Sequence, residues 1–349
     1  PMSNPLTDGV FVQTNDADEN AVVAFARAED GTLKSFGSFA TGGRGTGTPH
    51  LPSQGSLVVP NGGAHLLVAN AGSDDVSVFA LSGDAASLTD RVPSGGSTPR
   101  SIGVHGDLVY VLNTGGDAAG NVSGFRLSAD GRLKSIDGSS RPLSMDESDG
   151  AQVAFDPSGS TLVVTERVTD RVSTYTVGDD GLLDGPTAQA SSGATPYGFA
   201  FSADGTLVVS EAFGGEVGAA AASSYRIAPG SGAAPVSSSV RNTRSEVCWV
   251  VVTKDGRHAF VTNFGDGTVS SYAIAPKGAI ELLQPVAAET RLGEKGIRDA
   301  ALSADGSFLY ALDADSQEIY GWRVGDDGGL APLGAANGLP VTAAGLAAL

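Results

Sequence analysis

Two arginines stand out because the chain around them is strongly acidic. The 349 residues contain 21 Lys and Arg against 39 Asp and Glu, a formal net charge of −18. Arg100 and Arg298 each begin an apolar segment, and a guanidinium group binds a carboxylate through two parallel hydrogen bonds. The pair predicts a binding site for a small anionic or carboxylated substrate. The alternative is that both arginines form buried ion pairs, with Glu166, Glu211 or Asp299 as partners.

Four further residues are candidates for moving a proton. Glu166 and Glu211 end apolar segments at a position where Asn is commoner in this chain, and a carboxyl group beside apolar walls has a raised pKa that suits general acid–base work. Tyr197 begins an apolar segment and could donate a proton, or it simply lines a channel. His50 lies in a glycine-rich connection and is the one histidine placed to act as a base.

Other apolar segments of the chain carry further residues at the position that Arg100 and Arg298 occupy in theirs. We expect them to contact substrate, although they could merely fill and solvate a channel; they are Gln54, Gln152, Trp249 and Cys248. Cys248 is the single cysteine and could instead be a nucleophile, or inert packing.

An internal repeat explains how residues so distant in sequence could meet. Leu66–Phe79 and Ala259–Tyr272 share a pattern: a short apolar segment ends in Asn, a polar turn follows, and a Val-Ser-x-aromatic segment comes next. The aromatic residue recurs about every fifty residues, at Phe25, Phe79, Phe125, Tyr175, Tyr225, Tyr272 and Trp322. Alternating apolar residues separated by Asp-Gly and Ser-Gly turns indicate strands, so the sequence predicts an all-β, seven-bladed β-propeller with four antiparallel strands per blade.

The first and last segments fit a closed ring. The stretch 9–14 resembles the second strand of a repeat with no first strand before it, and 343–348 resembles the missing first strand. We therefore expect residues 1–349 to form a single domain whose ring is closed by the C-terminal strand joining the N-terminal blade, which removes an exposed sheet edge. First strands start, and second strands end, at one channel mouth. The candidate residues and the long segment 211–223, a possible lid or oligomer contact, would gather there.

Composition excludes several classes of function. A chain this acidic repels nucleic acid and anionic membranes, and a single cysteine excludes a disulfide framework. The N-terminal residues lack the charged and apolar regions of a signal peptide, so we expect a cytoplasmic protein.

The repeat residues resemble the seven-bladed β-propeller lactonase family, which includes bacterial 6-phosphogluconolactonase and fungal carboxymuconate lactonizing enzyme. The resemblance is carried by residues 66–79 and 260–272 and by the Ser-Ala-Asp-Gly turns that begin at Ser128, Ser202 and Ser303. It implies a cofactor-independent lactonase or cycloisomerase that uses His, Arg and Glu from several blades. Where the family has Pro-His-Gly this chain has Pro196-Tyr-Gly198, which makes Tyr197 or His50 the substitute for that histidine.

Two other functions remain open on the sequence. One is a non-catalytic propeller that binds a ligand or protein at the same face. The other is a calcium-dependent lactonase in which oxygen ligands in the channel hold the metal; its candidate ligands are Asn70, Asn113, Glu166 and Asn263.

Overall fold

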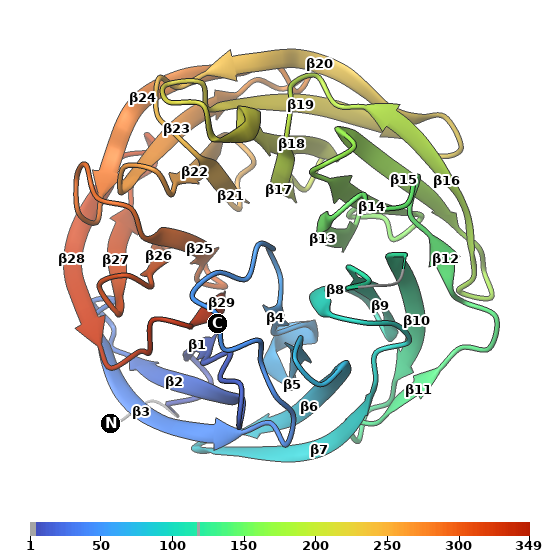
Figure 1. The fold of residues 1–349 in the computed structure, drawn as a ribbon. Helices are drawn as coiled ribbons and strands as arrows, with labels where there is room; N and C mark the ends of the chain where they lie inside the picture. Colours follow the sequence, from blue (N-terminus) through green and yellow to red (C-terminus); the bar gives the residue numbers. More distant parts are fainter. Residues whose placement is uncertain (1–4, 117–118) are drawn as a thin grey trace.

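The computed structural model describes residues 5–116 and 119–349, which form seven β-sheets around a central channel (Figure 1). Each sheet is a blade of four antiparallel strands, and the third blade carries one short extra strand. The strands run in chain order from the channel to the rim in every blade but the first, whose innermost strand is the C-terminal one. The predicted seven-bladed propeller is confirmed.

Each blade contributes one strand to each of four concentric layers. The innermost strands are β29 (Ala344–Ala348), β4 (Leu57–Val58), β8 (Pro99–His105), β13 (Gly150–Phe155), β17 (Pro196–Phe201), β21 (Val247–Val252) and β25 (Ile297–Leu302). The second strands are β1 (Val10–Gln13), β5 (His65–Asn70), β9 (Leu108–Asn113), β14 (Thr161–Glu166), β18 (Thr206–Glu211), β22 (His258–Asn263) and β26 (Phe308–Asp313). The third strands are β2 (Ala21–Arg27), β6 (Asp75–Ser82), β10 (Asn121–Leu127), β15 (Arg171–Val177), β19 (Ala221–Ala228), β23 (Thr268–Ile274) and β27 (Glu318–Val324). The rim strands are β3 (Leu33–Ala40), β7 (Ala85–Pro93), β11 (Leu133–Ser135) with β12 (Arg141–Pro142), β16 (Leu183–Ala190), β20 (Gly232–Arg241), β24 (Ile280–Glu289) and β28 (Leu330–Asn337).

Helical structure in the described residues is limited to two 3₁₀ turns, η1 (Asn61–Gly63) and η2 (Phe213–Gly215). Neither is long or apolar enough to cross a membrane.

The ring closes where the C-terminal strand meets the N-terminal blade. Strand β29 pairs antiparallel with β1, with Val10 opposite Ala348, and the guanidinium of Arg27 donates a hydrogen bond to the carbonyl of Leu349 (2.9 Å). The innermost strand of the first blade therefore comes from the other end of the chain, as expected.

The recurring aromatic side chains lie on the third strands and are buried between blades. All seven are at most 3% exposed. They pack against valines and leucines of the second strands, so the core is a ring of similar interfaces that fixes the angle between adjacent blades.

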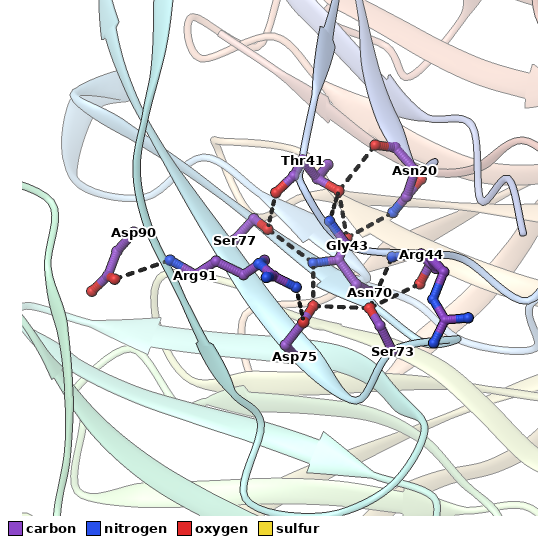
Figure 2. Close-up of polar contacts among 10 residues, drawn as sticks. All are labelled: Asn20, Thr41, Gly43, Arg44, Asn70, Ser73, Asp75, Ser77, Asp90 and Arg91. Atoms are coloured by element: carbon purple, nitrogen blue, oxygen red, sulfur yellow. Dashed lines mark hydrogen bonds and ion pairs between the residues drawn. The ribbon is translucent and has the colours of Figure 1, made fainter. Parts of the chain in front are cut away.

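A polar cluster joins adjacent blades at the ends of the second strands β5, β14 and β18. Figure 2 shows the cluster between the first two blades. The side-chain oxygen of Asn70 accepts hydrogen bonds from Asn20 (3.0 Å) and Thr41 (2.8 Å) of the first blade. Its amide nitrogen donates to Asp75 (2.7 Å) and Ser77 (2.9 Å) of the second. Asn70 is fully buried, and its four hydrogen bonds satisfy the carboxamide.

Glu166 and Glu211 occupy the same position in the fourth and fifth blades. Glu166 accepts hydrogen bonds from the backbone N–H (3.0 Å) and hydroxyl (2.9 Å) of Ser144, which precedes its blade, and from the hydroxyl of Ser173 on its third strand. Glu211 accepts from the N–H of Gly193 (2.5 Å), which also precedes its blade, and from Ser223 (2.8 Å) on the third strand. These carboxylates therefore join blades as Asn70 does.

The segment before β4 extends into the centre of the ring (Figure 1), where hydrogen bonds attach it to β21 of the sixth blade. The indole of Trp249 donates to the carbonyl of Ser53 (2.6 Å), and the amide of Gln54 bonds the backbone of Val250 in both directions (2.8 and 3.0 Å). Gly198 is required here, because a Cβ at that position would lie 2.1 Å from the Gln54 side-chain oxygen. The channel is therefore a pocket with a floor.

Shortening Leu346 on β29 tests the ring closure. Its side chain is 8% exposed in the core between the first and seventh blades, so Leu346→Ala should lower the free energy of unfolding by about 2–4 kcal/mol. Val341→Ala, at a site 45% exposed, should change it by less than about 0.5 kcal/mol. Urea denaturation of both variants measures the difference, and equal effects would mean that β29 does not close the ring.

The role of Glu166 can be separated from catalysis by two substitutions. Glu166→Ala leaves the N–H of Ser144 and the hydroxyl of Ser173 without a partner and should reduce stability by about 2–4 kcal/mol. Glu166→Gln keeps two hydrogen-bonding atoms and should reduce it far less. Urea denaturation measures both variants, and a Gln variant as unstable as the Ala variant would contradict a role for this side chain in joining the blades.

Candidate functional site at the channel mouth

Several of the candidate residues at the start of the innermost strands lie in β-bulges. The pairing of innermost and second strands shifts register between Pro99 and Ser101, between Pro196 and Phe199, between Val247 and Val250, and between Ile297 and Ala300. The residues inside these irregularities include Arg100, Tyr197, Cys248 and Arg298. A bulge breaks the alternation of side chains and directs an extra one away from the ladder, so the bulges are what present these residues at the mouth.

A hollow of about 690 Å³ opens at the mouth over the fourth, fifth and sixth blades. Three predicted residues line it, namely His50, Tyr197 and Cys248. The segment 211–223 contributes Phe213–Gly215 to its wall, so this segment does reach the mouth. Lining residues that the sequence reasoning did not select include Asp149, Arg167, Val168, Glu246 and Phe264.

Arg100 and Arg167 share one carboxylate beside the hollow. Arg100 lies 3.1 Å from one oxygen of Asp149, and Arg167 bonds the other oxygen. The guanidinium of Arg167 also lies over the ring of Tyr197, 5.1 Å from its centre. Within the described part of the chain, neither arginine Nε has a hydrogen-bond partner. The two guanidinium groups thus share the single carboxylate of Asp149, and each keeps an Nε–H group that can donate a hydrogen bond to a ligand.

Arg298 is the most enclosed of the three arginines. It is 3% exposed, and its ion pair is a single 3.3 Å contact with Asp315. Its Nε and Nη1 are buried and find no acceptor among the described residues. The ion-pair alternative is therefore right that these arginines have carboxylate partners but wrong about which ones: they are Asp149 and Asp315, not Glu166, Glu211 or Asp299.

Tyr197 and Cys248 are both protonated in this environment. Tyr197 is 3% exposed, and its hydroxyl has no partner among the residues described. Burial, followed by the neighbouring Cys248, raises the pKa of Tyr197 well above its ordinary value. Burial likewise raises the pKa of the Cys248 thiol, which does not favour a thiolate nucleophile. Tyr197 is thus a free hydrogen-bond donor.

His50 is exposed at the mouth with its ring 5.9 Å from that of Phe264. Although solvent reaches one side of the imidazole, the surrounding residues of the mouth partly desolvate it. This desolvation and repulsion by the cations of Arg298, Arg167 and Arg100 lower the pKa of His50 to about 4. Its imidazole is therefore neutral at pH 7 and can accept a proton.

Asp299, next to Arg298 in the same bulge, is a second titratable group that faces this region. It is 3% exposed, and one of its oxygens accepts a hydrogen bond from the N–H of Gly345 (3.1 Å). Burial raises the pKa of Asp299 to about 7.

Glu166 and Glu211 do not line the hollow. Their side chains are fully buried and point into the blades, where serine hydroxyls and backbone N–H groups occupy their oxygens. Burial raises the pKa of Glu211, while Ser223, Ser239 and the N–H of Gly193 oppose the shift. These positions do not support the acid–base role expected from the sequence.

Gln54, Gln152 and Trp249 also serve the scaffold. Gln54 bonds Val250 as described above, and Gln152 bonds the backbone of Phe199 in both directions (2.7 and 3.0 Å). Trp249 is fully buried beneath Ser53. Their polar atoms are taken by backbone groups of other blades, so they form the floor below the site and are not available to bind substrate.

The four residues considered for calcium lie in separate blades. Asn70 and Glu166 are occupied as above, Asn263 bonds Asn242 (3.0 Å) and Ser270 (2.9 Å), and Asn113 bonds the carbonyl of Ser94 (3.1 Å). The described residues also contain no cluster of three or more His, Cys, Asp or Glu side chains that could hold a metal. The proposed ligands do not converge.

A sequence signal for two missed residues does exist. The residue just after each second strand is small at Ala71, Ala212 and Ala314, whereas the fourth and sixth blades have Arg167 and Phe264 there. Both line the hollow. Comparing this one position across the repeats would have selected them.

Comparison with solved structures shows the same fold over nearly the whole chain. A protein from Lactobacillus plantarum matches with a TM-score of 0.77 at 17% identity, covering 97% of this chain and 98% of the other. A candidate 6-phosphogluconolactonase from Bacteroides uniformis matches with a TM-score of 0.72 at 18% identity, covering 97% and 98%. The periplasmic gluconolactonase of Pseudomonas aeruginosa matches with a TM-score of 0.69 at 17% identity, covering 96% and 97%. Identities this low establish the fold alone.

Sequence comparison identifies the family. No curated protein matches the chain. The profile described as lactonase, 7-bladed beta-propeller matches residues 15–141, 116–212 and 209–340, which together span most of the repeats. The bulged innermost strands, the closed ring and this match agree, and the chain belongs to the seven-bladed β-propeller lactonase family.

Proposed function

We propose that the protein is a cofactor-independent lactone hydrolase that acts on a small carboxylated substrate in the hollow at the channel mouth. One observation carries the proposal: buried hydrogen-bond donors without acceptors lie in the hollow or next to it in a protein of net charge −18. Within the described residues these donors are the hydroxyl of Tyr197, Nε and Nη1 of Arg298, and Nε of Arg100 and Arg167. Tyr197 and Arg167 line the hollow itself, whereas Arg100 shares Asp149 with Arg167, and the Arg298 guanidinium lies 5.4 Å from the centre of the Phe264 ring. An unpaired buried donor is unfavourable by about 1–3 kcal/mol, so an anionic ligand that supplies acceptors would stabilise this site.

The available groups can be assigned to the steps of lactone opening. The neutral imidazole of His50 accepts a proton from water as the water oxygen attacks the lactone carbonyl. The hydroxyl of Tyr197 donates a hydrogen bond to the oxyanion that develops. The carbonyl–oxygen bond of the ring then breaks, and the imidazolium returns its proton to the departing alkoxide. The arginines hold the substrate carboxylate throughout. A cycloisomerase that forms a lactone from an unsaturated acid would use the same anion-binding groups.

Neutralising one arginine should weaken the reaction of a charged lactone selectively. For Arg167→Gln or Arg298→Gln we expect kcat/KM to fall about 10- to 100-fold with 5-oxotetrahydrofuran-2-carboxylate, because a charge-assisted hydrogen bond contributes about 1.5–3 kcal/mol. Uncharged γ-butyrolactone should react at an unchanged rate. Proton release measured with both lactones provides the comparison.

Arg257→Gln is the matched control, because Arg257 has a 63% exposed side chain and pairs with Asp255 in a turn on the opposite face. Equal losses for both lactones would contradict carboxylate binding by the arginines. Tight binding of the carboxylate without turnover would favour the non-catalytic propeller.

The charges around His50 predict an unusual pH dependence. Because the pKa of His50 is lowered to about 4, activity should persist through pH 6 and fall only as the imidazole protonates near pH 4. Arg298→Gln removes the strongest of the repelling charges and should move the acid limb of kcat/KM to higher pH.

Titration of the histidine ring signals by NMR measures the same pKa directly. His50→Gln identifies the His50 signal among the four histidines. A pKa near 6.5 that does not respond to Arg298→Gln would overturn the assignment of His50 as a neutral base surrounded by cations.

A further inference from the structure

We propose that the hollow selects a carboxylate with an aromatic or other flat apolar body over a polyhydroxylated sugar acid. This inference rests on the proposed function and specifies the substrate class of the same site.

The walls of the hollow are largely apolar. Phe213 and Phe264 line it from the fifth and sixth blades, and Ala194, Ala212 and Val168 lie between and beside them. Val168 is 64% exposed, although it lies only two residues after β14, all of whose residues are buried. An apolar surface left open to water beside a charged group matches a ligand that has both characters.

Most polar groups in the wall already have partners within the protein. Asp170 accepts a hydrogen bond from the N–H of Thr195 (2.8 Å), and the Thr195 hydroxyl accepts one from the N–H of Gly214 (2.9 Å). Glu246 pairs with Lys295 (2.7 Å), and Asp149 holds two arginines. Asp170 and Glu246 each keep one carboxylate oxygen outside these contacts, and the Thr195 hydroxyl can still donate. The groups that suit an anionic ligand are those of Tyr197, Arg167 and His50, because the two carboxylates repel a second anion.

A largely apolar wall with few free polar groups suits an aromatic carboxylate better than a sugar acid. A sugar acid carries more hydroxyl groups than the few remaining polar atoms of the wall can bond, and each hydroxyl left unpaired loses about 1–3 kcal/mol of binding free energy. An aromatic ring needs no such partners. It gains from burial against Phe213 and Phe264, and edge-to-face contact between aromatic rings adds about 0.5–1.5 kcal/mol.

The arrangement also orients such a ligand. Its carboxylate would approach the guanidinium of Arg167, which lies over Tyr197 at one side of the hollow. Its ring would lie toward Phe264, whose own ring is near His50. The group to be attacked would then lie between the base and the phenolic donor.

Isothermal titration calorimetry with three carboxylates tests the inference. The probes are 3-phenylpropanoate, D-gluconate and 6-phosphogluconate. We expect 3-phenylpropanoate to bind at least tenfold more tightly than either sugar acid. Val168→Asn, a neutral polar change at an exposed site, should lower the affinity for 3-phenylpropanoate about three- to fivefold without lowering the affinity for D-gluconate. Phe36→Ala, at a 38% exposed residue on rim strand β3, is the control and should change neither affinity.

The outcomes separate this inference from the proposed function. Equal or tighter binding of D-gluconate or 6-phosphogluconate would overturn the aromatic preference while leaving an anion site at the mouth. Loss of all three affinities in Arg167→Gln, together with tight 3-phenylpropanoate binding in the parent, would support both. Failure of every carboxylate to bind the parent protein at 10 mM would overturn the proposed function, and the inference with it.

Discussion

The pairing of β29 with β1 is the constraint on which the site depends. The first blade is completed by the other end of the chain, because its innermost strand β29 pairs with β1, and this pairing links the two ends of the ring. Closure sets the spacing of all the other innermost strands. Arg100, Tyr197 and Arg298 follow one another at intervals of about a hundred residues and are held around one mouth by the closed ring; β29 itself is bonded to Asp299, the residue next to Arg298.

The closed ring would by itself give a channel lined by regular strands, and two local departures convert it into a site. Bulges at the start of the innermost strands present Tyr197 and Arg298 at the mouth. The segment that carries Ser53 and Gln54 crosses the channel and gives it a floor. Together they enclose guanidinium groups that would otherwise be solvated. Enclosure both leaves their donors unpaired and lowers the pKa of His50.

The sequence was sufficient for the fold because the fold is repeated. The recurring aromatic residue, such as Tyr175, is buried at the same position in every blade. Seven copies of the pattern therefore identify the strands even where one copy departs from it. The site is the opposite case, since it consists of departures from the repeat. Position in the repeat located Tyr197 and His50 at the hollow, but Glu166 at the end of β14 proved to replace an Asn in a cluster that joins blades. A carboxylate at the end of a second strand occupies the same position in the repeat whether its side chain faces a ligand or a serine hydroxyl. Only the direction of the side chain distinguishes the two, and spacing alone does not determine it.

The same reasoning bears on why tyrosine stands where the family resemblance places histidine. A histidine at position 197 would be buried beside Arg167 and would lose its proton to both desolvation and repulsion. Tyrosine keeps a neutral donor at that place and accepts the guanidinium on its ring face. In the proposed mechanism the base is His50, which comes from the segment that crosses the channel and is not part of any blade. In this arrangement the ring of blades supplies the donors and cations, and a single connection supplies the proton acceptor. The base could therefore be lost or replaced without disturbing the blades that bind the anion.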